Sequence, residues 1–318
     1  MSEEKILLEC KNVKKYFNTP RGLLHAVDDV SFCLNEGETL GVVGESGCGK
    51  STLGRTILNI LPATEGQIFF EGKEISHMNA RQMKPLRSKM QMIFQDPYSS
   101  IDPKMTVSQI IAEPFQINKT YRSAKERQEK AKELMEIVGL DMRYVNAYPH
   151  ELDGGRRQRI GIARALALNP QFIVCDEPVS ALDVSIQAQI LNLLMDLKED
   201  RRLTYMFITH DLSVVKHISD QILVLYMGKM FEMADSDRLF ENPLHPYTKA
   251  LFSAIPIPEL GQKTDDEDVL KGEVSSPINP PQGCRFAPRC KFAKEECRKV
   301  TPEFKEVEPG HHCACHLF

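Results

Sequence analysis

The nine residues from Gly44 to Thr52 constrain the fold of this chain more than any other stretch. They match the pattern G-x-x-x-x-G-K-[ST] at every specified position. A short apolar run at 39–43 precedes them, and apolar residues at helical spacing follow from 52 to 61. A loop between a buried strand and a helix N-terminus can turn successive backbone N–H groups toward an anion. The sequence therefore predicts a phosphate-binding loop in an α/β fold.

The residue types in this loop suit a polyphosphate and its metal ion. The glycines remove side chains that would keep the backbone away from the phosphates. Lys50 supplies a mobile positive charge for the β- and γ-phosphates, and the Ser51 hydroxyl suits Mg²⁺. We expect the nucleotide to contact Gly44, Ser46, Gly47, Cys48, Gly49, Lys50, Ser51 and Thr52.

Length and composition predict one large domain plus an appendage. The chain has 318 residues, of which 42% are hydrophobic, so it can bury a sizeable core. A net charge of −4 gives no global attraction to nucleic acid or anionic lipid. The chain has no uninterrupted apolar window of about 18 residues and no signal-peptide core at its start, so we expect a cytoplasmic protein.

Four polar residues follow apolar runs that we predict to be strands. Gln95 comes after the run at 90–94, Asp176 and Glu177 follow the run at 172–175, and His210 follows 205–209. The carboxyl ends of strands in open α/β sheets are where ligands bind. We therefore predict that Asp176 joins Ser51 around Mg²⁺ and that Glu177 polarises the attacking water. Gln95 suits a contact to Mg²⁺ or water, although such a glutamine taken alone is more often a surface residue, and a lone histidine such as His210 is more often structural.

Two further features point to the same ligand. The run 152–156 places Gly154 and Gly155 at the start of a helical pattern, which predicts a second anion-binding N-terminus. Tyr16 closes the first of two predicted β segments, 6–17 and 26–34. Its ring suits stacking on adenine, and it equally suits an ordinary edge-strand tyrosine.

Cysteines mark the C-terminal part of the chain. Cys10, Cys33 and Cys175 lie in strand-like apolar settings and are predicted core thiols. After residues 256–258 the composition becomes acidic and then proline-rich. We predict a domain at 1–257, with a helical subdomain at about 96–160, and a cysteine-rich extension at 258–318.

The spacing C-x₅-C-x₆-C-x₁₅-C in this extension leaves four interpretations open. They are a disulfide framework, unligated thiols, structural zinc and a [4Fe–4S] cluster. The paired C-x₂-C of zinc sites is absent, and the nearby histidines His311, His312 and His316 are alternative ligands. The four predicted ligands are Cys284, Cys290, Cys297 and Cys313, with Cys315 left over.

With these residues in hand, the chain resembles the ATP-binding subunits of ABC importers for oligopeptides and dipeptides, specifically the F-type subunits of peptide permeases. The general ABC elements occur in the family's order: 44–51, Gln95, 152–156, 176–177, 180–183 and His210. The narrower assignment rests on 95–103, on 243–248 and on the cysteine tail.

The resemblance implies a P-loop NTPase core of the RecA type, with an antiparallel β subdomain, an inserted helical subdomain and a small cysteine-rich extension. It implies that ATP and Mg²⁺ bind between two ATPase chains, each contributing a phosphate loop to one site and a signature to the other. Tyr16 would stack on adenine, Gln95 would sense the γ-phosphate and the membrane subunit, and His210 would brace the γ-phosphate. Asp153, Gly154, Gly155 and Arg156 would meet the partner's ATP. Similar tails bind a [4Fe–4S] cluster, which favours it over Zn²⁺.

The implied partners are a homologous ATPase chain in a heterodimer, two transmembrane permease subunits and, indirectly, an extracytoplasmic solute-binding protein. No nucleic acid is implied, and the expected location is the cytoplasmic face of the membrane. Two other classes of protein are alternatives: a soluble ABC ATPase acting on nucleic acid or ribosomes, and a non-hydrolysing scaffold. A single cassette without a strongly basic face argues against the first, and intact Lys50, Glu177 and His210 argue against the second.

The signature departs from the family pattern. The usual Leu-Ser-Gly-Gly-Gln is here Leu152-Asp153-Gly154-Gly155-Arg156. An ionised Asp153 about 4 Å from a γ-phosphate would be repelled by roughly 4 kcal/mol at an effective dielectric constant near 20. We therefore predict an asymmetric heterodimer, in which the site built on this chain's Lys50 and Glu177 hydrolyses ATP and the site that it completes for its partner is slow. The alternative is that Arg156 offsets the charge and both sites turn over.

Overall fold

The computed structural model describes residues 5–96, 98, 100–253 and 276–318. The chain divides into two compact units, which we describe separately. Unit 1 comprises Met1–Met78 and Phe207–Phe318, and unit 2 comprises Asn79–Met206. The chain passes from unit 2 back into unit 1 within strand β8 (Thr204–Ile208).

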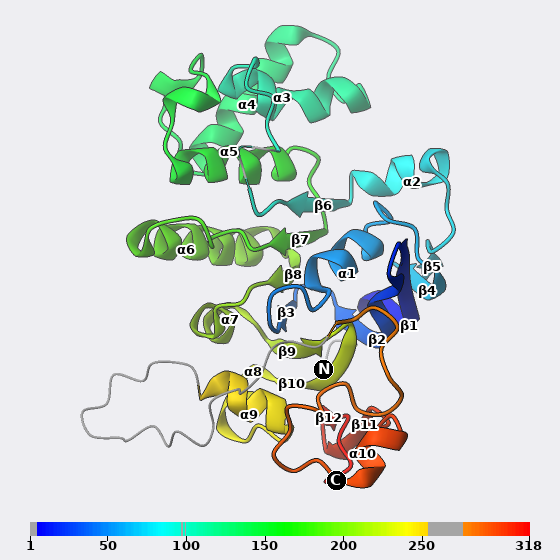
Figure 1. Cartoon of the computed structure of the whole chain (residues 1–318). Helices are drawn as coiled ribbons and strands as arrows, with labels where there is room; N and C mark the ends of the chain where they lie inside the picture. Colours follow the sequence, from blue (N-terminus) through cyan, green and yellow to red (C-terminus); the bar gives the residue numbers. More distant parts are fainter. Residues whose placement is uncertain (1–4, 97, 99, 254–275) are drawn as a thin grey trace, which may run out of the picture. The chain divides into compact units, whose positions relative to one another are not determined.

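Unit 1 contains a four-stranded antiparallel sheet in the order β2-β1-β4-β5. The hairpin of β1 and β2 is longer than the predicted segments 6–17 and 26–34. It extends to Thr19 and Gly22 because the Thr19 hydroxyl donates to the Gly22 carbonyl across the turn (2.7 Å). The strands, seen together in Figure 1, are β1 (Ile6–Thr19), β2 (Gly22–Asn35), β4 (Glu65–Phe70) and β5 (Lys73–Glu74).

Strand alternation decides which of the three predicted core thiols are buried. Cys10 and Cys175 are 2% and 0% exposed, as predicted. The prediction for Cys33 is wrong, because β2 turns Phe32 and Leu34 inward and therefore turns Cys33 to the surface.

The phosphate loop belongs to the second sheet of unit 1. Strand β3 is fully buried and pairs in parallel with β9, which turns back into antiparallel β10 through Met227 and Gly228 at φ 47° and 81°. The unit's helices are α1 (Lys50–Ile57), α7 (Leu212–Ile218), α8 (Ser236–Glu241), α9 (Pro246–Phe252) and α10 (Glu295–Lys299). The strands are β3 (Thr39–Val43), β9 (Gln221–Tyr226), β10 (Lys229–Asp235), β11 (Lys305–Glu308) and β12 (His311–Cys313).

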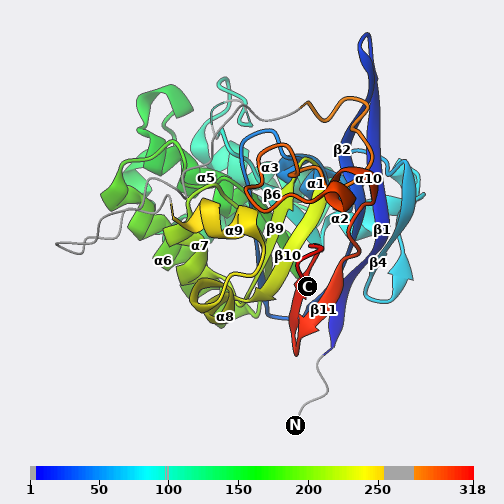
Figure 2. The ribbon, with the colours of Figure 1, turned by 60° about the horizontal axis from the view of Figure 1, so that its bottom comes forward.

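The C-terminal segment, residues 276–318, adds to both sheets of unit 1. Strand β12 pairs with β10, and β11 pairs with β12, as Figure 2 shows. The proline-rich stretch joins the β1–β2 hairpin, where Ile278 bridges Leu24. Phe286 is 2% exposed in the same core cluster as Tyr226 and Tyr247. The predicted boundary at 257/258 lies outside the described residues, and the division into domain and extension stays a prediction.

Unit 2 contains the parallel pair of β6 and β7 and most of the helices of the central part of the chain. Within the predicted helical subdomain, residues 107–137 form two helices, because Lys119 adopts a left-handed conformation (φ 54°) and Ser123 caps a new start. Helices α3, α4 and α5 pack together (Figure 1). The elements are α2 (Ala80–Arg87), β6 (Met90–Ile93), α3 (Val107–Asn118), α4 (Ala124–Ile137), α5 (Gly154–Leu166), β7 (Phe172–Asp176) and α6 (Val184–Arg201).

Among the helices in the described parts of the chain, none combines the length and the apolar character needed to cross a bilayer.

Candidate nucleotide site

The backbone of the phosphate loop requires its glycines. Gly44 and Gly49 have φ values of 148° and 106°, and a Cβ atom at either would lie about 2 Å from a carbonyl oxygen, at 2.1 Å from Leu225 and 2.0 Å from Ala26. Gly47 also has a positive φ, of 76°, but faces open space. The loop therefore lies tightly on the strands beneath it and is open at Gly47, which suits a loop that receives a large anion.

Lys50, the first residue of α1, lies inside the loop with 5% of its surface exposed. Its ammonium group donates to the carbonyl oxygens of Gly44 (2.7 Å) and Glu45 (3.1 Å). The lysine charge is therefore held where phosphate oxygens would enter, and these two hydrogen bonds must be exchanged for bonds to phosphate.

The other loop residues surround this lysine. Ser46 and Gly47 are exposed, and Ser51 and Thr52 are half-buried in the first turn of α1. Cys48 is buried, and burial raises the pKa of its thiol. The Cys48 carbonyl accepts the N–H of Gly228 (2.7 Å), so the β9–β10 turn supports the loop from below.

His210 and Tyr16 are the other predicted site residues in unit 1. The N–H of Thr209 donates to the Val42 carbonyl (3.2 Å), so the chain reaches exposed His210 beside the strand that leads into the phosphate loop. Tyr16 lies within β1 rather than at its end. Its ring lies 4.1 Å from that of His25, and its hydroxyl donates to Asp28 (2.6 Å).

The two carboxylates predicted from the strand at 172–175 lie in unit 2. Asp176 is fully buried as the last residue of β7, and Glu177 follows at a left-handed φ of 47°. The amide of Gln95 donates to the Glu177 carboxylate (2.8 Å). Sequence reasoning placed both residues at strand ends but did not predict this contact. The register of β6 and β7 accounts for it, because Ile93 pairs with Cys175 and the side chains two residues later face each other.

The signature residues begin helix α5, also in unit 2. Asp153 is the N-cap, and one of its oxygens accepts the N–H of Arg156 (2.8 Å). Its other oxygen pairs with the Arg156 guanidinium. A Cβ atom at Gly155 would lie 2.6 Å from the Ile186 side chain, so glycine allows close packing there. Asp153 therefore carries its charge within an ion pair.

Four cysteines of the C-terminal segment line one cavity of about 20 Å³. Each sulfur accepts at least one backbone N–H. Cys284 accepts from Phe286 and Ala287, Cys290 from Phe292, Cys297 from Lys294 and Cys315 from Leu317. Burial nevertheless raises the pKa of Cys284 to about 11, and it raises the pKa values of Cys290 and Cys315 as well. The four are Cys284, Cys290, Cys297 and Cys315.

Cys313, the fourth predicted ligand, lies elsewhere. It is fully buried in β12, where it pairs with Glu232 of β10 and Lys305 of β11. The structure thus places Cys315 with the other three thiols in the position that the spacing assigned to Cys313. Chain spacing missed this because β12 fixes which residues face the cavity, and the strand register is not visible in the spacing.

The described residues provide no assembled metal centre. No three of their histidine, cysteine, aspartate or glutamate side chains come close enough to hold a metal ion together. His311, an alternative ligand, is fully buried and hydrogen-bonds to Glu232 (2.7 Å). His316 lines the thiol cavity, and its ring bonds to the Val300 carbonyl (2.9 Å). The four thiols line one cavity without converging on a point.

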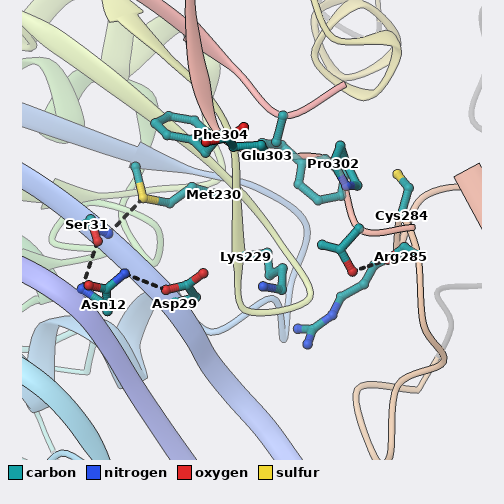
Figure 3. Close-up of a pocket in the computed structure, with 14 residues that line it drawn as sticks. Asn12, Asp29, Ser31, Lys229, Met230, Cys284, Arg285, Pro302, Glu303 and Phe304 are labelled. Carbon is teal, nitrogen blue, oxygen red and sulfur yellow. Dashed lines mark hydrogen bonds between the residues drawn. The ribbon is translucent and has the colours of Figure 1, made fainter. Parts of the chain in front are cut away.

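A second cavity, of about 550 Å³, lies between the β1–β2 hairpin, β10 and the C-terminal segment (Figure 3). On the hairpin side, Asn12 and Asp29 have left-handed φ values of 49° and 63° and hydrogen-bond to each other (2.8 Å). Lys229, Arg285 and Glu303 supply further charge to its walls. No motif in the sequence indicated this cavity, because its walls come from distant parts of the chain.

Comparison with known proteins agrees with this geometry. Residues 27–180 match the family model "ABC transporter", and residues 231–297 match "Oligopeptide/dipeptide transporter, C-terminal region". The chain is 52% identical to the oligopeptide transport ATP-binding protein AppF of Bacillus subtilis, covering 100% of this chain and 99% of that protein. It is 51% identical to the oligopeptide transport ATP-binding protein OppF of the same organism, over 97% of this chain and 96% of that protein.

Solved structures of ATP-binding cassettes have the same fold. The post-hydrolysis dimer of the cassette MJ0796, bound to ADP and Pi, is 30% identical with a TM-score of 0.67, covering 72% of this chain and 99% of that one. The cassette cbiO1 of Clostridium perfringens shares the fold with a TM-score of 0.66 at 24% identity. The match covers 75% of this chain and 92% of that one. The predicted P-loop NTPase fold is confirmed, and the chain belongs to the oligopeptide/dipeptide group of ABC transporter ATP-binding subunits.

Proposed function

We propose that this chain binds and hydrolyses Mg-ATP as a subunit of an ABC importer for oligopeptides or dipeptides. The phosphate loop carries the proposal, because its glycine geometry and its buried lysine suit a nucleotide polyphosphate. The identity of about half of all residues with oligopeptide transport ATP-binding proteins supports the choice of solute.

In this proposal, Lys50 exchanges its bonds to loop carbonyls for bonds to the β- and γ-phosphates. Ser51, Gln95 and Asp176 hold Mg²⁺, since hydroxyl, amide and carboxylate oxygens are the ligands that this ion prefers. The bound ion supplies positive charge to the phosphate oxygens. Tyr16 stacks on adenine and His210 braces the γ-phosphate. The loop contacts come from Gly44, Ser46, Gly47, Cys48, Gly49 and Thr52.

Glu177 acts on the attacking water. The hydrogen bond from Gln95 orients the Glu177 carboxylate, and in this proposal the carboxylate accepts a proton from the attacking water. Because Gln95 also serves the nucleotide, its amide couples the arrival of ATP to the position of the base.

The Glu177→Gln variant tests the proposal. It removes the proton acceptor but keeps the side-chain shape, so ATP turnover should fall about 10²- to 10⁴-fold. The Kd for ATP should stay within about threefold of wild type, because the phosphate contacts remain. Turnover is measured by phosphate release and binding by a fluorescent ATP analogue.

The matched control is Lys50→Ala, which should lose ATP binding itself. Wild-type turnover in Glu177→Gln would remove Glu177 from the role of base. Unchanged ATP binding in Lys50→Ala would reject the phosphate loop as the nucleotide site.

We propose that the chain pairs with a homologous ATPase subunit and docks on two transmembrane permease subunits at the cytoplasmic face of the membrane. An extracytoplasmic solute-binding protein would deliver the peptide. The dimeric state of a related cassette supports pairing of two ATPase chains. In this proposal, Asp153, Gly154, Gly155 and Arg156 face the partner's ATP. A net charge of −4 offers no support for the nucleic-acid alternative.

For the thiol cavity we propose a [4Fe–4S] cluster, with Zn²⁺ as the alternative, held by Cys284, Cys290, Cys297 and Cys315. The shared cavity supports this ligand set, and the backbone N–H donors would stabilise sulfurs bound to a cation, although burial raises the pKa values of Cys284, Cys290 and Cys315. Ligation requires the four sulfurs to move closer together than they lie in the structure. The bound group would link four separate turns of the C-terminal segment.

Metal analysis of Cys315→Ser and Cys313→Ser, purified without oxygen, tests this ligand set. Loss of iron and sulfide, or of zinc, in Cys315→Ser with retention in Cys313→Ser is the expected result. The opposite pattern would return Cys313 to the ligand set. Wild-type protein without metal would end the proposal of a resident group.

A further inference from the structure

Two arginines next to the cavity cysteines extend from the C-terminal segment to the nucleotide site of unit 1. Arg285 follows Cys284, and Arg289 precedes Cys290. Their side chains are 4% and 7% exposed, and both form ion pairs with residues of the first fifty of the chain. A tail that only covered the surface would not need to bury two guanidinium groups there, because buried charge is costly unless it is paired.

Arg289 holds the phosphate loop through Glu45. Its two terminal nitrogens lie 2.7 Å and 3.0 Å from the two carboxylate oxygens of Glu45, which is a bidentate ion pair. One of them also donates to the Tyr226 hydroxyl (3.3 Å). The Glu45 carboxylate is thereby fixed by a residue 244 positions away in the chain.

The backbone of Glu45 is fixed as well. Its N–H donates to the hydroxyl of buried Tyr247 (2.9 Å), and its carbonyl accepts from Lys50 (3.1 Å). When Lys50 leaves this carbonyl to bind phosphate, the Cys48 N–H (3.2 Å) and Tyr247 still hold the Glu45 backbone, and Arg289 holds its side chain. Of these three contacts, only the one from Arg289 comes from the C-terminal segment, so it links that segment to the position of the loop during the exchange.

Arg285 supports the same loop from beneath. Its guanidinium pairs with Asp28, which also accepts the Tyr16 hydroxyl, and donates to the Met227 carbonyl. The neighbouring Gly228 then donates its N–H to Cys48 in the loop (2.7 Å). The C-terminal segment thus contacts the loop through Arg289 and is linked through Asp28 to the tyrosine proposed to stack on adenine.

We propose that Arg289 is a positioning residue for ATP binding, acting through Glu45, and that it couples the C-terminal segment to nucleotide affinity. The proposal rests on the nucleotide binding at the phosphate loop. Arg289 keeps the loop in its phosphate-binding form while Lys50 changes partners. By thermodynamic reciprocity, ATP stabilises the attachment of the C-terminal segment by the same factor.

The test measures the Kd of a fluorescent ATP analogue for the full chain in four forms: wild type, Arg289→Gln, Glu45→Gln and the double variant. Each single variant should weaken binding about tenfold, in the range of typical coupling between sites. The double variant should be no weaker than either single one, because both remove the same pair. ATP and GTP should lose affinity equally, since the pair acts on the loop and not on the base.

Arg238→Gln is the matched control. Arg238 also connects the C-terminal segment to the rest of unit 1, because it links helix α8 to Glu308 (2.6 Å) and the Pro309 carbonyl, and no hydrogen bond or ion pair of Arg238 in the described structure reaches the phosphate loop. It should leave the Kd unchanged. Metal content is measured for every preparation, so that a change in Kd is not due to loss of a bound group.

Hydrogen exchange provides the second readout. ATP should slow exchange of amides at 284–297 in wild type and not in Arg289→Gln.

An unchanged Kd in both Arg289→Gln and Glu45→Gln would overturn the proposal. An equal loss of ATP affinity in Arg238→Gln would overturn it too, because it would mean that any weakening of the attachment of the C-terminal segment has the same effect. If Arg289→Gln fails to fold, the Kd of the isosteric variant Glu45→Gln decides whether the ion pair contributes to ATP binding. Unaltered binding by Lys50→Ala would instead reject the nucleotide placement.

Discussion

At the scale of single residues, Cys48 places a thiol inside the phosphate loop. It is 5% exposed, and its sulfur lies 3.8 Å from the Lys50 ammonium. Burial raises its pKa above the ordinary value of 9.0, although the lysine charge opposes the shift. The thiolate, which is the reactive form, is therefore scarce at neutral pH.

We predict that iodoacetamide modifies Cys48 slowly at pH 7.5. The rate should rise about tenfold per pH unit up to at least pH 9, because the fraction of Cys48 present as thiolate rises by the same factor. Peptide mass spectrometry follows the reaction, with exposed Cys33 as the internal comparison. ATP should protect Cys48 and not Cys33. Equal rates at both thiols would contradict the buried placement, and full ATP binding after modification would contradict the role of the loop.

At the scale of elements, helix α9 begins with a buried histidine cap. The ring of His245 accepts the N–H of Tyr247 (2.9 Å), and its backbone N–H donates to buried Glu232 (2.8 Å). Burial lowers the pKa of His245 to about 3. The cap therefore works in the neutral form, and Tyr247 in turn fixes the backbone of Glu45 in the phosphate loop.

The lowered pKa predicts a loss of stability in acid. The unfolded chain binds a proton at His245 below about pH 6.5, and the folded chain does not until about pH 3. The contribution of neutral His245 to the free energy of unfolding is complete above pH 6.5. It declines as the pH falls, by about 2 kcal/mol between pH 6.5 and pH 5. In His245→Asn, which keeps a capping side chain, the free energy of unfolding by urea should fall less over this range than in wild type. Parallel pH profiles would contradict the prediction.

At the scale of the whole molecule, the altered signature is the part of this chain that we propose to face the ATP of a partner ATPase chain. The structure pairs Asp153 with Arg156, which favours compensation over a slow site. Both side chains are substantially exposed, at 56% and 40%, so solvent screens the pair and its contribution is small.

We predict that Asp153→Ser changes ATP turnover of the assembled transporter less than about twofold, whereas Arg156→Gln lowers it by up to about fivefold, because the second change leaves the carboxylate uncompensated. The double variant, which has the usual Ser-Gly-Gly-Gln, should match wild type. Phosphate release by the complex with its partner ATPase chain measures all three. A severalfold increase in Asp153→Ser would instead support the asymmetric heterodimer.

Much of the nucleotide site follows from local sequence. The phosphate loop, the strand ends at Gln95 and Asp176, and the start of α5 at Gly154 lie where their motifs predicted. Other features depend on register between distant strands. The contact of Gln95 with Glu177 needs the pairing of β6 with β7, and the absence of Cys313 from the thiol cavity needs the pairing of β12 with β10.

The sequence by itself determined the phosphate loop, because binding by consecutive backbone N–H groups needs only neighbouring residues, with glycine where φ is positive. Only the tertiary structure decided what supports that loop. Arg289 lies 244 positions from Glu45, and Arg285 lies 257 positions from Asp28. No local pattern encodes such ion pairs, because they form only after the C-terminal segment has packed against β10 and the β1–β2 hairpin.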